Sequence, residues 1–177
     1  MNVKYSVFIS NVASCSDRYC GAYGRKFSIE EMFERVKSID SIKAVDIVLT
    51  EEFKDNIETV KECIRKSSLE LASVAVDTFA NPIFQKGSLS SIDEKVRRQA
   101  IDDAKFAVDF AKEMGCKIVT LWPGQDGYDY MFAADYIKER TLFTDALREI
   151  CEYDKDVVVT LDYKLKEPRT HSYISTV

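Results

Sequence analysis

The sequence predicts an α/β fold, a partial barrel in which about five parallel strands alternate with outer helices. Five short β-branched apolar runs recur along the 177 residues, segments of helical period separate them, and only 6 glycines and 3 prolines interrupt the pattern. With 46% hydrophobic and 31% charged residues, the composition is that of an ordinary globular protein. At roughly 150 residues per domain, this length corresponds to about one domain.

The apolar runs are predicted as strands. Short, continuous β-branched runs are typical of strands buried on both faces of a parallel sheet. In chain order, the five runs are Lys4–Ile9, Val45–Leu49, Leu69–Val76, Lys117–Trp122 and Val157–Leu161.

Four amphipathic helices are predicted between these strands. A capping box formed by Ser28 and Glu31 starts the first helix. A second capping box, Ser91 with Glu94, starts the third helix, and Gly115 ends it. The apolar stripes that face the core fall within the segments Ile29–Val36, Phe53–Ile64, Val96–Met114 and Phe143–Ile150.

Alternating strands and helices leave two architectures open, a doubly wound sheet and part of a barrel. A flavodoxin-like sheet would finish with a helix after the fifth strand, and a dinucleotide site would need G-x-G-x-x-G after the first strand. The sequence has neither feature. We therefore predict a partial (β/α)8 TIM barrel whose strands follow one another in sequence order.

Charge and composition exclude several classes of function. The 25 Lys and Arg against 30 Asp and Glu give a net charge of -5, which does not favour a nucleic-acid partner. No apolar run approaches the roughly 18 residues of a membrane span, so we expect no membrane contact and a cytoplasmic location. Five cysteines without a C-x-x-C pair indicate reduced thiols, and with His171 as the single histidine any metal must bind to carboxylates.

Polar residues follow every predicted strand, and two groups among them point to chemistry. Asp162 and Lys164 lie two apart, so both side chains are predicted to project from one face of the sheet. A buried pair of this kind is costly unless it is compensated, as by a divalent cation and a polar substrate; a plain salt bridge is the alternative. Trp122, before the small loop Pro123–Gly124, is suited to form the wall of a sugar pocket or to fill the core.

Longer segments carry a resemblance to a known family. Residues 121–130 read L-W-P-G-Q-D-G-Y-D-Y, and residues 162–174 read D-Y-K-L-K-E-P-R-T-H-S-Y-I. Together with Gly87–Leu89 and Val96–Ile101, they resemble the xylose isomerase-like TIM barrels, and among these the bacterial xylose and L-rhamnose isomerases. The resemblance covers essentially the whole chain.

The resemblance implies an aldose-ketose isomerase, which moves hydrogen between C1 and C2 of a small sugar, or an epimerase, with a divalent metal (Mn, Co or Mg) as cofactor. At the matching positions it implies Asp162 as a metal ligand and Lys164 as the catalytic residue at the reacting oxygen. It implies Trp122, Gln125 and Asp126 as substrate-binding residues. Such chemistry is consistent with a hard cation and an ammonium stabilising charge on an enediolate.

The chain departs from the family in two respects. Asp162 stands where the family usually has glutamate, and the missing methylene withdraws the carboxylate by roughly 1.3 to 1.5 Å, against a tolerance of about 0.2 Å for metal ligands. A complete barrel has eight strands and about 250 residues. We therefore expect one domain over residues 1–177, truncated after the fifth strand and inactive as a fragment alone.

Two other functions remain open. A non-catalytic remnant or assembly module would keep the fold without turnover. An abasic-site endonuclease of the same superfold is disfavoured by the acidic charge balance. Because an unclosed barrel exposes strand edges and apolar interior, we expect a homo-oligomer. His171 is expected to be structural or exposed rather than catalytic.

Overall fold

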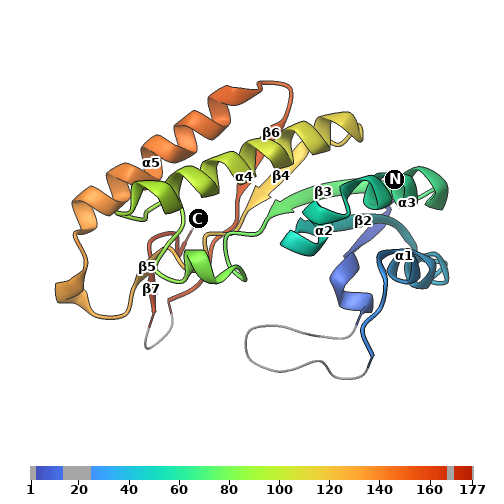
Figure 1. Cartoon of the computed structure of the whole chain (residues 1–177), viewed down its shortest axis with the longest axis horizontal. Coiled ribbons are helices and arrows are strands. Elements are labelled where there is room, and N and C mark those ends of the chain that lie inside the picture. The colour runs from blue at the N-terminus through green and yellow to red at the C-terminus, as the bar shows by residue number, and fades with distance from the viewer. Residues whose placement is uncertain (1–2, 14–24, 167–169, 177) are drawn as a thin grey trace.

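A computed structural model describes residues 3–13, 25–166 and 170–176 and contains a five-stranded parallel sheet (Figure 1). The strand order, β1-β2-β3-β4-β6, follows the sequence. In a doubly wound sheet, the order of the strands would reverse about an inner strand. The order found here has no such reversal, so the predicted α/β fold, a partial (β/α)8 TIM barrel, is confirmed. The strands are β1 (Tyr5–Phe8), β2 (Ile42–Leu49), β3 (Glu70–Val76), β4 (Ile118–Leu121) and β6 (Val158–Leu161).

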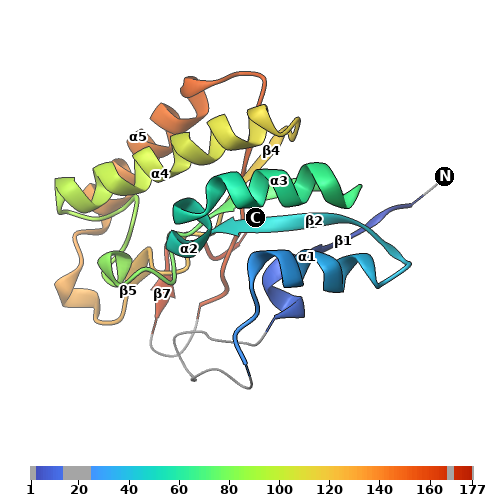
Figure 2. The same ribbon diagram turned by 45° about the vertical axis from the view of Figure 1, so that its right-hand side comes forward.

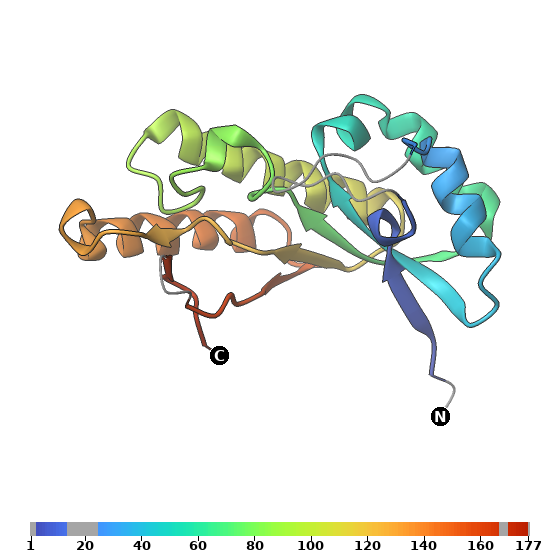
Figure 3. The ribbon, with the colours of Figure 1, turned by 90° about the horizontal axis from the view of Figure 1, so that it is seen from below.

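The helices lie on one side of this sheet, as Figures 2 and 3 show. None of the described helices is long and apolar enough to cross a membrane. Among the described residues, three short 3-10 helices occupy the loops at Ile9–Val12, Pro82–Phe84 and Met131–Ala133. The α-helices are α1 (Ile29–Lys37), α2 (Glu51–Asp55), α3 (Ile57–Ser67), α4 (Glu94–Glu113) and α5 (Tyr136–Tyr153).

The prediction of a single helix over Phe53–Ile64 is wrong, because the helix is interrupted at Asn56 and forms α2 and α3. Asn56 has φ -115° and ψ 31°, outside the helical region, and its side-chain amide donates to the Glu52 carbonyl at 2.8 Å. Asparagine side chains compete in this way with the backbone bonds that continue a helix.

The helix caps are partly as predicted. The Ser28–Glu31 capping box is present in full, and Gly115 follows α4 with a left-handed φ of 73°. The predicted cap at Ser91 is wrong, because Asp93 caps α4 and accepts from the Lys95 amide. Ser91 instead belongs to a turn, in which its N–H donates to the Ser88 carbonyl.

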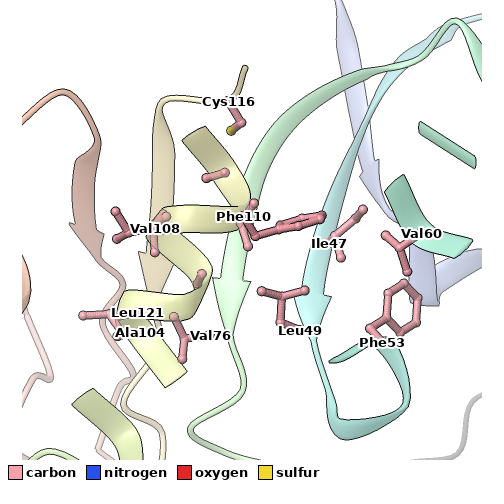
Figure 4. Packing of buried hydrophobic residues seen from close by; sticks show 14 of the residues in the cluster. Ile47, Leu49, Phe53, Val60, Val76, Ala104, Val108, Phe110, Cys116 and Leu121 are labelled. Carbon is pink, nitrogen blue, oxygen red and sulfur yellow. The ribbon is translucent and has the colours of Figure 1, made fainter. Parts of the chain in front are cut away.

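The core lies between the sheet and the helices. Alanines on α4 let this helix approach β3 and β4 closely, and Phe110 fills the space toward β2 (Figure 4). The prediction of strands buried on both faces is wrong for the face away from the helices. There, Ile118 is 40% exposed and Val158 is 58% exposed, although Val119 beside Ile118 is fully buried. The described helices cover one face of the sheet, so alternate residues on the other face remain accessible.

A second sheet was not predicted. Two short strands, β5 (Gly127–Tyr128) and β7 (His171–Ser172), pair antiparallel, so His171 lies in a strand rather than in the expected loop. Elements of two residues carry no periodicity that a sequence can reveal. The pairing brings the segment after β6 back beside the loop that follows β4.

Candidate functional site

The candidate site is built from the loops that follow three neighbouring strands. β3, β4 and β6 are adjacent and parallel, so the residues after Val76, Leu121 and Leu161 meet at one edge of the sheet. These loops bring Phe79, Trp122 and Asp162 to the edge where the carboxyl ends of the strands lie.

Both the indole ring and the backbone of Trp122 have partners in the loop after β3. Its ring lies 4.3 Å from that of Phe79, centroid to centroid, at an interplanar angle of 45°. The Thr78 hydroxyl donates to the Trp122 carbonyl at 3.1 Å. A Cβ on Gly124 would lie 2.6 Å from the Phe79 ring, so only glycine permits this packing. Trp122 is half-buried, which leaves part of its indole accessible.

Gln125 lies beside this aromatic pair. Its side-chain amide donates to the Phe79 carbonyl at 3.4 Å, and the residue is half-buried. Gln125 also lines a cavity of about 670 Å³ between the loops 83–93 and 125–134, whose lining includes neither Trp122 nor Lys164. Gln125 therefore bonds to the residue that packs on Trp122 and also borders this cavity.

Asp126 has a different environment from the one that the sequence implied. It is 1% exposed, and its carboxylate accepts from the backbone N–H groups of Ser88 and Ser90 and from the Ser88 hydroxyl. Burial raises the pKa of this carboxyl group, and the hydrogen bonds from the two serines oppose that rise. These bonds direct the carboxylate into the protein. Contact between Asp126 and a substrate stays a prediction.

Asp162 and Lys164 follow the last strand of the sheet. The Asp162 amide donates to the Leu121 carbonyl at 2.8 Å, which continues the ladder between β4 and β6 by one residue. The alternation of the strand therefore places Asp162 on the same face as Thr160. The Lys164 amide donates to the Ile174 carbonyl at 2.9 Å. The pair is not buried as expected, since Asp162 is exposed and Lys164 half-buried.

The described residues do not fit a divalent metal by themselves. Ions such as Mg²⁺ take six oxygen ligands, usually including several carboxylates or waters. Within residues 3–13, 25–166 and 170–176, no group of three or more histidine, cysteine or acidic side chains could hold a metal ion. Asp162 offers one carboxylate, so metal binding there stays a prediction.

The structure adds residues that the sequence did not indicate. Phe79 supports Trp122, and the ring of Tyr128 stacks on His171 at 4.9 Å with an interplanar angle of 5°. The Nδ1 atom of His171 is buried without a hydrogen-bond partner in the part of the chain that the structure describes. Such pairs join residues more than 40 positions apart, and no local pattern in the sequence indicates them.

The arrangement defines a class of protein. A parallel sheet in sequence order, with helices on one side and polar groups gathered where its strands end, is the architecture of barrel-type α/β proteins, whose sites lie at that end. A model of the family described as xylose isomerase-like TIM barrel matches residues 33–163. The chain belongs to the xylose isomerase-like TIM barrel family.

Similar proteins include two bacterial xylose isomerases. That of Fervidobacterium gondwanense is 30% identical over 121 residues, which cover 66% of this chain and 28% of the relative. That of Bacillus subtilis (strain 168) is 26% identical over 173 residues, 89% of this chain and 39% of the relative. The chain thus spans well under half the length of these curated relatives.

Solved structures share the fold. A D-tagatose 3-epimerase-like protein has a TM-score of 0.64 at 19% identity, covering 81% of this chain and 52% of that one. An L-ribulose 3-epimerase has a TM-score of 0.65 at 12% identity, covering 98% of this chain and 53% of that one. At these identities the likeness concerns the fold alone.

Proposed function

We propose that this chain carries the sugar-binding half of an aldose-ketose isomerase or epimerase site and is inactive alone. The observation that carries the proposal is the half-buried Trp122, whose ring packs against Phe79 at the carboxyl end of β4, next to the strand that Asp162 and Lys164 follow. Membership of the xylose isomerase-like family supports a small sugar as the ligand.

The residues suit the polar and apolar faces of a sugar. An indole ring offers a wide apolar surface to the C–H groups of a pyranose or an open-chain sugar. The amide of Gln125 can donate to and accept from hydroxyl groups. The Lys164 ammonium is suited to stabilise negative charge on a sugar oxygen when a proton leaves the neighbouring carbon.

Asp162 is proposed as one oxygen ligand of a divalent metal (Mn, Co or Mg), the cofactor that the family resemblance implies. When bound, such an ion would polarise the sugar oxygens. Among the described residues, Asp162 is not part of any group of three or more histidine, cysteine or acidic side chains that could hold such an ion. A cytoplasmic location likewise stays a prediction of the sequence.

We also propose that a second copy of the chain covers the face of the sheet away from the helices. Phe8 and Val158 are 39% and 58% exposed, and β1 and β6 each have one neighbour in the described sheet. Exposed apolar surface and unpaired strand edges both favour association. A non-catalytic assembly module is the second candidate function, and this face is the observation that favours it.

Substitution of Lys164 tests the proposed function. Because Trp122 is the single tryptophan, its fluorescence reports directly on ligands at the site. In titrations with xylose, Lys164→Met should weaken binding about tenfold or more, the effect of losing a hydrogen bond from a charged group. Lys166→Met, on an exposed neighbour, is the matched control and should bind as the wild type does. Wild-type fluorescence that does not respond to any sugar would favour the assembly module.

A further inference from the structure

Asp126 joins three loops that come from different strands. Its carboxylate holds the turn at Ser88 and Ser90, which lies between β3 and α4. Its own carbonyl accepts from the Tyr173 amide at 3.0 Å, in the segment that returns after β6. Its amide donates to the Pro123 carbonyl at 3.1 Å, which closes the turn directly after Trp122.

These bonds hold the loop that carries two residues of the candidate site. Trp122 lies four residues before it and Gln125 one residue before it, in the same loop. The Ser88 amide lies 3.0 Å from the carboxylate and the Ser90 amide 2.7 Å, so both bonds have ordinary lengths. If the carboxylate were lost, two buried N–H groups would have no acceptor, and the loop would have to move to satisfy them.

A buried carboxylate is costly unless its hydrogen bonds are satisfied, which indicates that the geometry it maintains is important. Its partners are two backbone N–H groups and one hydroxyl, and each can also be satisfied by a neutral amide. An asparagine oxygen would accept from both N–H groups, and its NH₂ would donate to the Ser88 hydroxyl. The shape and bonding of residue 126, more than its charge, therefore match these partners.

We propose that Asp126 is a positioning residue, which anchors the loop that carries Trp122 and Gln125 to the turn at Ser88 and Ser90 before a sugar binds. This inference rests on the proposed function, and it replaces direct contact with the substrate as the role of this carboxylate.

The test compares Asp126→Asn with Asp126→Ala. Asp126→Asn keeps the bonding pattern, so it should leave the emission maximum of Trp122 unchanged and the affinity for xylose within about threefold. Asp126→Ala removes all three bonds, so it should shift the emission maximum to longer wavelength and weaken affinity about ten- to hundredfold, as expected when buried N–H groups lose their acceptor and the loop moves. Ser88→Ala removes one bond and should give an intermediate shift, which provides the measurement if the alanine variant does not fold.

A destabilised control separates positioning from general loss of stability. Val45→Ala, at a fully buried position in the first half of β2, should lower stability and leave the Trp122 emission unchanged. The proposal is overturned if Asp126→Ala leaves emission and affinity unchanged. It is also overturned if folded Asp126→Asn loses as much affinity as Asp126→Ala, since that would indicate direct contact by the charge. An emission shift in Asp126→Ala, in a chain that binds no sugar, would support the positioning role while contradicting the proposed function.

Discussion

Glu149 forms ion pairs that join two of the helices on the sheet. Its carboxylate accepts from the Arg98 guanidinium at 2.6 Å and from the Lys105 ammonium at 2.7 Å, so it connects α5 to α4. The bond from Arg98, with that from Lys105, lowers the pKa of Glu149 from 4.5 to about 2. Its side chain is 37% exposed, so solvent screens much of this interaction.

We predict that Glu149→Gln lowers the free energy of unfolding at pH 7 by about 1 kcal/mol, the upper range for an exposed ion pair. The folded pKa lies below the unfolded one, so this stabilisation is present above the unfolded value of 4.5 and is lost as pH falls toward 2. Urea denaturation of both proteins across this range measures the difference. A gap that stays constant down to pH 2 would contradict the prediction.

At the scale of elements, the sequence predicted the strands and the helix cap that depend on residues close together in the chain. The five main strands occur where β-branched runs predicted them, and the Ser28 cap uses partners three residues apart. Contacts between distant segments could not be predicted. The pairing of β5 with β7 joins segments more than 40 residues apart, and Asp126 finds its partners 36 and 38 residues away.

Part of the candidate site could likewise be predicted from the sequence, and part of it could not. Trp122 could be placed at a strand end from the sequence, because the run before it is a clear strand. The support that Phe79 gives to its ring, and the exposure of Asp162, depend on how three loops pack together. Such packing is decided by tertiary contacts that local sequence patterns do not contain.

Two glycines allow a prediction about elements. Gly115 ends α4 with φ 73°, and a Cβ at this position would meet no other part of the chain within 4 Å. Gly115→Ala should therefore lower stability by about 1 kcal/mol through backbone strain alone. Gly124→Ala would place a Cβ 2.6 Å from the Phe79 ring, so it should change Trp122 fluorescence as well. Thermal unfolding and emission spectra of both variants measure these effects. A change of Trp122 emission in Gly115→Ala would contradict this assignment.

At the scale of the whole molecule, the sheet has two unlike faces. The described helices lie against one face (Figure 3). The other face carries exposed apolar side chains such as Ile118 and Val158. Burying apolar surface contributes roughly 25 cal/mol per Å², so covering several hundred Å² would favour association by several kcal/mol. This difference between the faces is the physical basis for the proposed second copy.

We predict that the wild-type chain is at least dimeric at tens of micromolar, and that Val158→Lys shifts it toward the monomer because it places a charge on the uncovered face. Light scattering coupled to gel filtration measures the mass. Phe132→Ser is the matched control, since Phe132 is 82% exposed but lies in the loop after β5. A folded, monodisperse monomer for the wild type would show that the uncovered face does not associate.

The most direct test of the proposed sugar site is an NMR titration of the ¹⁵N-labelled chain with xylose, tagatose and ribulose. Trp122 gives the one indole N–H signal of the protein, so that signal reports on the candidate site without ambiguity. We predict a saturable shift of the Trp122 indole together with the backbone amide of Lys164, and no such shift with glycerol. Saturable shifts confined to other residues, or none at any sugar concentration, would contradict the assignment of a sugar site at this end of the sheet.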